Sequence, residues 1–150
     1  MTATEELSPA ALAKENPRIN LVEAMIASCP QVELKTHHVF TPGLYTRTIF
    51  MPKGAILTSK IHKTEHPFVI SQGRALVYTE DSGTIDMQAP YMGVTKPGTR
   101  RVLEILEDCI WSTFHVTEKT DVDEIETDII EAHDFSHSEI QPEEIRSCLG

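Results

Sequence analysis

The stretch PKGAILTSKIHKTEHPFVISQG, residues 52–73, decides the fold of this chain. Residues 55–62 and 67–70 are rich in apolar and β-branched side chains, which is typical of short β-strands. Two glycines, Gly54 and Gly73, lie near its ends, and between them stand Lys60, His62 and His66. The stretch therefore predicts two strands, with Lys60 and His62 on the first and His66 directly before the second.

The segments on either side continue the β pattern. Residues 32–36 alternate between apolar or threonine side chains and charged ones, and residues 44–50 are mostly β-branched or aromatic. Residues 74–79, 102–106 and 110–116 are further strand candidates, and turn-forming residues occur at 42–43, 71–73 and 81–83. Short strands at such regular intervals predict a sandwich or barrel, which the last two segments would close.

Both ends of the chain predict helices. Serine-proline and asparagine-proline pairs at 8–9 and 16–17 are start signals, and Thr120 or Asp121 can cap a helix near the other end. A further short helix is predicted from residue 141. We divide the chain into a helical segment 1–30, a β-barrel 31–117 and an acidic helical segment 118–150. The two predicted apolar stripes are Ile19, Val22, Met25 and Ile26, and Val122, Ile125, Ile129 and Ile130.

Length and charge limit the function classes. A chain of 150 residues with a formal net charge of −10 fits one soluble domain, and its acidity weighs against binding to nucleic acid. No apolar run approaches the roughly 20 residues that cross a bilayer, and the first residues lack a signal-peptide pattern. The three cysteines lack metal-type spacing, which indicates reduced thiols. We therefore expect a cytoplasmic protein that does not bind a membrane.

The spacing within residues 52–73 resembles the first motif of the cupin superfamily. In that motif a glycine, five residues, His-x-His, a short gap, a glutamate, six residues and a glycine span two strands. Here Lys60 stands at the first histidine position and His66 at the glutamate position, while His62 is retained. Residues 95–102 are similar to the second motif, with Arg101 in place of its histidine. The resemblance covers about residues 43–117.

This resemblance implies a mainly β fold, the cupin double-stranded β-helix or jelly-roll barrel, with helices flanking it at both ends. The chain is similar to small single-domain RmlC-like cupins whose metal-site residues are altered. In such a barrel the side chains at positions 60, 62, 66 and 101 would converge in the interior.

Two chemical interpretations of these side chains remain open. His62 and His66 predict a site for one divalent transition metal such as zinc, iron, nickel or manganese, with Glu65 or His115 as the third ligand. Alternatively, Lys60, Arg101 and Glu65 are ligand-binding residues, and the two cations hold a small carboxylate or phosphate. The same three residues could instead form an internal ion network that binds nothing.

Two function classes follow from these interpretations. The first is a binding module that holds a small anionic or oxygenated ligand, or that serves as an oligomeric structural protein. The second is a metal-dependent enzyme of the isomerase, lyase or dioxygenase type, with Lys60 or Glu65 moving a proton. Small cupins commonly pair, so we also expect a homodimer or larger homo-oligomer whose contacts lie on the two helical stripes.

Overall fold

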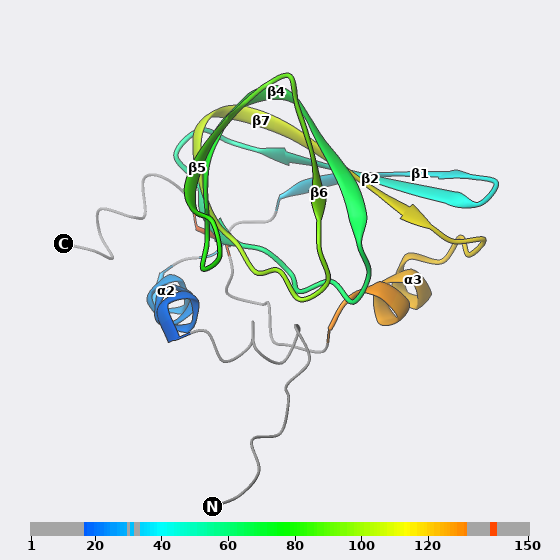
Figure 1. Cartoon of the computed structure of the whole chain (residues 1–150), viewed down its shortest axis with the longest axis horizontal. Helices are drawn as coiled ribbons and strands as arrows, with labels where there is room; N and C mark the ends of the chain where they lie inside the picture. Colours follow the sequence, from blue (N-terminus) through cyan, green and yellow to red (C-terminus); the bar gives the residue numbers. More distant parts are fainter. Residues whose placement is uncertain (1–16, 30, 32–33, 132–138, 141–150) are drawn as a thin grey trace, which may run out of the picture.

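The computed structural model describes residues 17–29, 31, 34–131 and 139–140 (Figure 1). It is mainly β, as predicted, and every strand pair is antiparallel. The predicted helices before residue 17 and after residue 140 lie outside the described residues. The elements are α2 (Pro17–Ala27), β1 (Lys35–Thr41), β2 (Leu44–Met51), β3 (Ile56–Thr58), β4 (His66–Thr79), β5 (Gly83–Gln88), β6 (Tyr91–Thr95), β7 (Val102–Val116), α3 (Val122–Ile129) and β8 (Glu139–Ile140).

Two long strands, β4 and β7, organise the fold. They pair with each other and pass through two layers, as Figure 1 shows. In the first sheet, strands follow the order β1-β2-β7-β4-β6, and in the second the order is β8-β3-β7-β4-β5. This arrangement of two layers that share two bent strands is the predicted jelly-roll architecture. The sheet is not closed. Residues 102–116 form one continuous strand and not the two closing strands that we expected.

The bend of β4 replaces a turn that the sequence predicted at residues 71–73. The pairing of β4 with β7 shifts register between Ile70 and Ala75, and Gly73 has a φ of 94° there. A side chain at Gly73 would place its Cβ 2.3 Å from the main-chain oxygen of Asp108, so only glycine fits. The chain therefore bends as a β-bulge and continues in the same strand.

The main core lies between the two layers. The ring of Phe68 stacks on that of Trp111 with 4.8 Å between their centroids, and both belong to the first sheet. The second sheet contributes small and branched side chains, so the two layers interlock. The buried members of this core are Met51, Ala55, Leu57, Phe68, Ile70, Ala75, Val77, Met87, Leu103, Ile105, Cys109 and Trp111.

Helix α2 packs near β3. Its residue Ile26 and the following Cys29 are buried against Val22 and Ile56. Cys29 is disulfide-bonded, so the expectation of reduced thiols is wrong there, whereas Cys109 is free and buried.

Helix α3 packs on the inner side of β2. Asp121 caps it by accepting a hydrogen bond from the Glu124 backbone, and Ile125 and Ile129 are buried against Tyr45. Ile19 and Ile26 of the first apolar stripe are also buried within the chain. The buried residues of both helical stripes are therefore not available for the subunit contact that we predicted for them. Neither described helix is long and apolar enough to cross a membrane.

Candidate functional site

Three histidines from three segments meet inside the fold. His62 lies in the loop between β3 and β4, where it forms a β-bridge with Ile130 just after α3. His66 is the first residue of β4, and His115 lies near the end of β7. The ring centroid of His66 is 4.3 Å from that of His62 and 4.5 Å from that of His115. One nitrogen from each ring lies within 4.8 Å of the others, which is close enough for a shared metal ion.

Hydrogen bonds orient two of these rings. The backbone carbonyl of Thr64 lies 3.2 Å from Nδ1 of His66, and because a carbonyl only accepts, Nδ1 carries the proton and Nε2 has a free lone pair. Nε2 of His115 lies 3.0 Å from Oγ1 of Thr113. The other nitrogen of His115, Nδ1, is buried without a hydrogen-bond partner. Such an orphaned buried atom is what a missing ligand would satisfy.

The three imidazoles are neutral at pH 7. Burial, followed by the neighbouring His66 and His115, lowers the pKa of His62 to about 2. Burial is also the main cause that lowers the pKa of His115 to about 4 and that of His66 below its usual value. A neutral imidazole offers the lone pair that binds a metal ion, and three of them are a known donor set for zinc. The residues present therefore fit a divalent transition metal.

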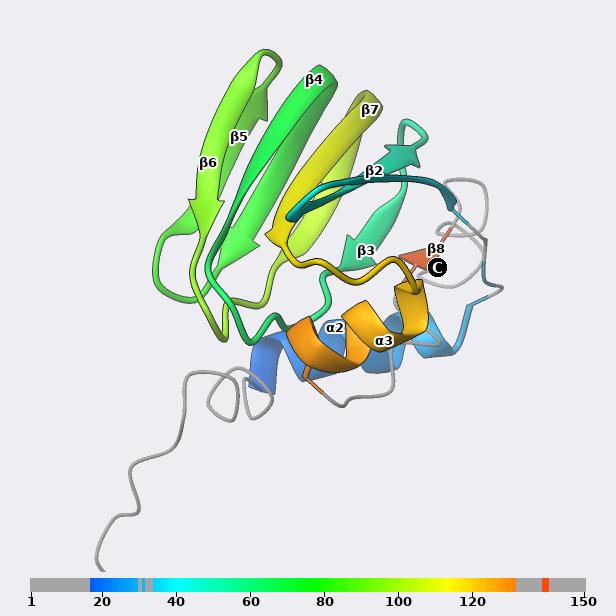
Figure 2. The same cartoon turned by 90° about the vertical axis from the view of Figure 1, so that its right-hand side faces the viewer.

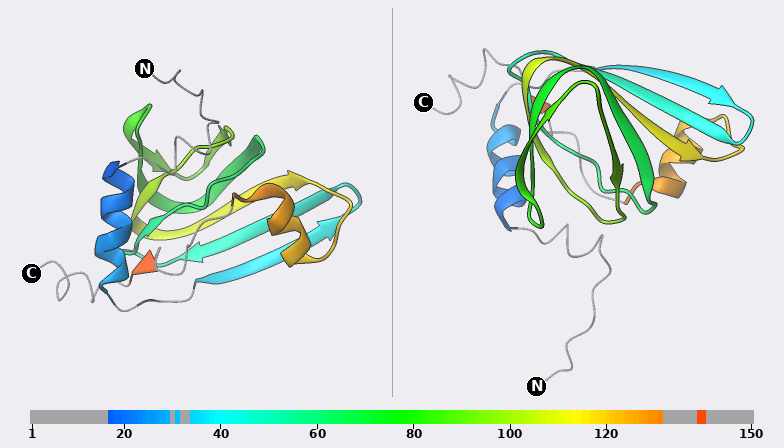
Figure 3. Two further views of the ribbon diagram at one scale, coloured as in Figure 1. Left: turned by 90° about the horizontal axis from the view of Figure 1, so that it is seen from below. Right: turned by 45° about the horizontal axis from the view of Figure 1, so that its top comes forward.

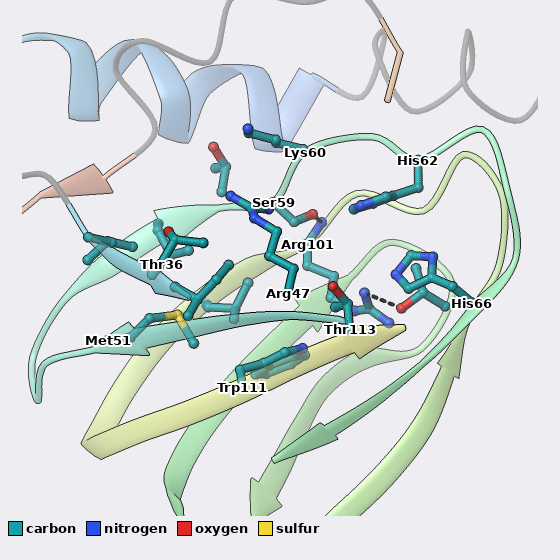
Figure 4. A pocket seen from close by; sticks show the side chains of 16 residues that line it. Thr36, Arg47, Met51, Ser59, Lys60, His62, His66, Arg101, Trp111 and Thr113 are labelled. Atoms are coloured by element: carbon teal, nitrogen blue, oxygen red, sulfur yellow. Dashed lines mark hydrogen bonds between the residues drawn. The ribbon is translucent and has the colours of Figure 1, made fainter. Parts of the chain in front are cut away.

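A cavity of about 260 Å³ extends from His62 and His66 between the two layers. Figure 4 shows both rings at one end of this cavity, two arginines in its middle and Trp111 on its floor. Leucine, isoleucine and methionine side chains line the rest together with threonines. The cavity thus combines apolar side chains with cationic ones.

Arg101 and Arg47 supply two of the cationic groups. Arg101 donates from Nη1 to Oγ1 of Thr95 at 2.9 Å, and its guanidinium carbon lies 5.1 Å from the ring centroid of Phe68. Burial lowers the pKa of Arg101, because partial desolvation disfavours its charged form. Nε of Arg47 is buried without a hydrogen-bond partner. Among the residues that the structure describes, no carboxylate forms an ion pair with either guanidinium.

The structure brings together four of the predicted site residues around this cavity: Lys60, His62, His66 and Arg101. The ammonium of Lys60 is 3.3 Å from a carboxylate oxygen of Glu126 on α3. Glu65 is exposed and does not line the cavity. Lys60 is therefore paired with an acid from α3, while Arg101 faces the cavity.

Sequence reasoning missed Arg47. In β2 the side chains of Tyr45, Arg47 and Ile49 point to the same face of the sheet, because successive residues of a strand alternate. Tyr45 is buried, and Ile49 packs against the core. A charged residue at an inward position of a predicted strand was the signal that could have identified it.

No family model and no curated protein matches the chain. Solved structures that resemble it include KdgF from Halomonas sp., with 16% identity and a TM-score of 0.49 over 65% of this chain and 91% of that one. A cupin-2 domain protein from Shewanella frigidimarina has 15% identity and a TM-score of 0.45, with 59% of this chain and 83% of that one covered. An RmlC-like cupin from Methanocaldococcus jannaschii has 10% identity and a TM-score of 0.47, covering 57% of this chain and 82% of that one.

Proteins described as cupins are thus among the solved structures found. At these identities the matches carry no information about a ligand or a reaction.

Proposed function

We propose that this protein binds a small organic anion, such as a carboxylate, in the cavity between its two layers. The observation that carries the proposal is the pair of half-buried guanidinium groups, Arg47 and Arg101, which line the cavity and have no carboxylate partner among the described residues. A buried charge is costly unless it is paired, so an anion from solution would complete this site.

The rest of the cavity matches such a ligand. A guanidinium can donate two parallel hydrogen bonds to a carboxylate, and Thr95 already holds one end of Arg101 in place. The apolar lining around Trp111 and Leu103 would receive the hydrocarbon part of the ligand. A volume of about 260 Å³ restricts the ligand to a small molecule.

Calorimetric titration with acetate, benzoate and inorganic phosphate tests this proposal. We expect at least one of them to bind the wild-type protein, and Arg101→Ala to weaken that binding by roughly 30-fold or more, since removing one partner of a buried charge pair costs about 2 kcal/mol or more. Arg101→Lys should restore binding only in part, because an ammonium cannot form the forked contact. Arg74→Ala is the matched control, since Arg74 is exposed and pairs with Asp86.

Two results would contradict the proposal. One is a wild-type protein that binds none of the three probes. The other is an Arg101→Ala variant that binds as well as the Arg74→Ala control.

A metal-dependent function is the second candidate, and the cluster of His62, His66 and His115 favours it. A metal held there would act as a Lewis acid toward an oxygen of the bound molecule. Arg47 and Arg101 lower the pKa of His62 through their charge, and the same repulsion opposes a cation, so an anion in the cavity should strengthen metal binding.

Elemental analysis of tag-free protein from metal-supplemented medium tests the second candidate. We expect close to one metal ion per chain in the wild type and in His37→Ala, an exposed histidine outside the cluster, but none in His62→Ala. Wild-type protein without stoichiometric metal would reject the metal site and leave the anion site as it stands.

A further inference from the structure

The charged side chains that line the cavity are all cationic. They are Lys60, Arg47 and Arg101, and no acidic residue belongs to the lining in the described part of the chain. The whole chain nevertheless carries a formal net charge of −10. A cleft lined by one sign of charge attracts the opposite ion. An acid that pairs with one of these three cations therefore opposes the binding of an anion.

Glu126 of α3 is such an acid. Its Oε1 accepts a hydrogen bond from Nζ of Lys60 at 3.3 Å. Glu126 does not line the cavity but a neighbouring groove between α3 and the strands β1 and β2. Figure 4 shows Lys60 at the rim of the cavity, on the side away from Trp111. Lys60 thus lies between the cavity and an acid outside it.

Helix α3 fixes the position of Glu126. The apolar side of the helix is buried against Tyr45 of β2. Nζ of Lys63 donates a hydrogen bond to the backbone carbonyl of Thr127 at 3.0 Å, from the same loop between β3 and β4 that carries Lys60. Figure 2 shows α3 beneath the strands, and Figure 3 shows it next to β1 and β2. A helix that is already packed on the sheet therefore presents the carboxylate to Lys60.

The ion pair itself is weak enough to be exchanged. The side chain of Lys60 is 29% exposed and that of Glu126 is 36% exposed. Water competes for both groups at such exposure, so a pair of this kind contributes little to stability. Lysine also carries its ammonium on a flexible four-carbon chain, which lets Nζ turn toward another acceptor.

We propose that Glu126 is a positioning residue that competes with the bound anion for Lys60. This inference rests on the proposed function, because it takes the cavity as the anion site. Without an anion, Lys60 pairs with Glu126. When an anion occupies the cavity beside Arg47 and Arg101, Nζ of Lys60 turns to it and the carboxylate of Glu126 is left to water. Glu126 thus lowers the affinity of the cavity for anions.

Calorimetric titration with acetate, benzoate and inorganic phosphate at low salt tests the competition in the wild type, Glu126→Gln, Lys60→Met and the double variant. Glu126→Gln should bind the probe roughly twofold to fivefold more tightly than the wild type, the range that a partly exposed ion pair supports. A residue that merely stabilised the fold would weaken binding when replaced. In the Lys60→Met background, Glu126→Gln should change the affinity much less, because the acid acts through Lys60.

Asp128→Asn is the matched control. Asp128 lies on the same helix, and its carboxylate pairs with Lys119 at 2.7 Å, away from the cavity. The control removes the same charge from the same helix as Glu126→Gln, so it should bind the probe as the wild type does. Circular dichroism checks that every variant keeps the fold.

Two results overturn the inference and leave the proposed function in place, provided that the wild type binds a probe and Arg101→Ala weakens that binding. One is a Glu126→Gln variant that binds no more tightly than Asp128→Asn. The other is an equal gain from Glu126→Gln with and without Lys60. If no probe binds the wild type or Glu126→Gln, the proposed function fails and the inference fails with it.

Discussion

Replacing Gly73 by alanine adds one methyl group where β4 passes from the first sheet to the second. The new Cβ would lie 2.3 Å from the oxygen of Asp108 and 2.8 Å from its carbonyl carbon. Both are main-chain atoms of β7, so neither can rotate away as a side chain would. The backbone of Gly73 also has a φ of 94°, which side chains disfavour.

Two terms set the size of the effect. A left-handed backbone costs a residue with a Cβ roughly 1–2 kcal/mol. Overpacking against atoms that cannot yield costs about 1–3 kcal/mol more. We therefore expect Gly73→Ala to lower the free energy of unfolding by roughly 2–5 kcal/mol, a large fraction of the 5–15 kcal/mol that is typical of a domain.

Comparison with Gly83→Ala separates the cost of the backbone conformation from the cost of overpacking. Gly83 has a φ of 66°, but no atom lies within 4 Å of the Cβ that alanine would add. Both variants also restrict the unfolded chain similarly, so this contribution cancels in the comparison. Urea unfolding, followed by the fluorescence of the single tryptophan, Trp111, gives both free energies. If Gly73→Ala costs no more than Gly83→Ala, the contact with the Asp108 backbone does not constrain the bend and our reasoning is wrong.

Two further predictions concern the site and α2. The folded state holds the pKa of His62 at about 2 and that of His115 at about 4, below the roughly 6.5 of a histidine in an unfolded chain. Below about pH 6.5 the unfolded state therefore binds more protons than the folded state. The metal-free protein should lose stability as the pH falls through that range. Urea unfolding at pH 7 and pH 5 should show that the free energy of unfolding falls less in His62→Gln than in the wild type. An equal fall in both proteins would contradict the lowered pKa of His62. Arg100, which is 3% exposed, forms an ion pair with Glu23 of α2. Arg100→Met removes this ion pair and should speed hydrogen exchange in α2, while unchanged exchange would show that the pair does not hold the helix.

Much of the architecture was determined by local sequence patterns. The alternation in residues 44–50 and the spacing in residues 52–73 predicted a mainly β fold, because a half-buried strand must repeat every two residues. The same spacing identified Lys60, His62 and His66, which lie close together along the chain. Arg101 came from a second motif, and the structure places it in the same cavity.

Contacts between distant segments decided the rest. The sequence left Glu65 and His115 as alternatives for a third ligand. Only the pairing of β7 with β4 brings His115 next to His66, while Glu65 lies exposed. Residues 71–73 carry the composition of a turn, yet the β7 backbone beside Gly73 keeps the strand continuous.

The outer face of the first sheet depends in the same way on strands far apart in the chain. Val94 follows Leu44 by fifty positions, and no local pattern shows that both belong to one sheet with Val116. Which strands become neighbours is set by hydrogen bonds and side-chain packing across the whole sheet. Periodicity along a single strand shows which residues share a face, and only the register of that strand with its partners shows what lies beside them.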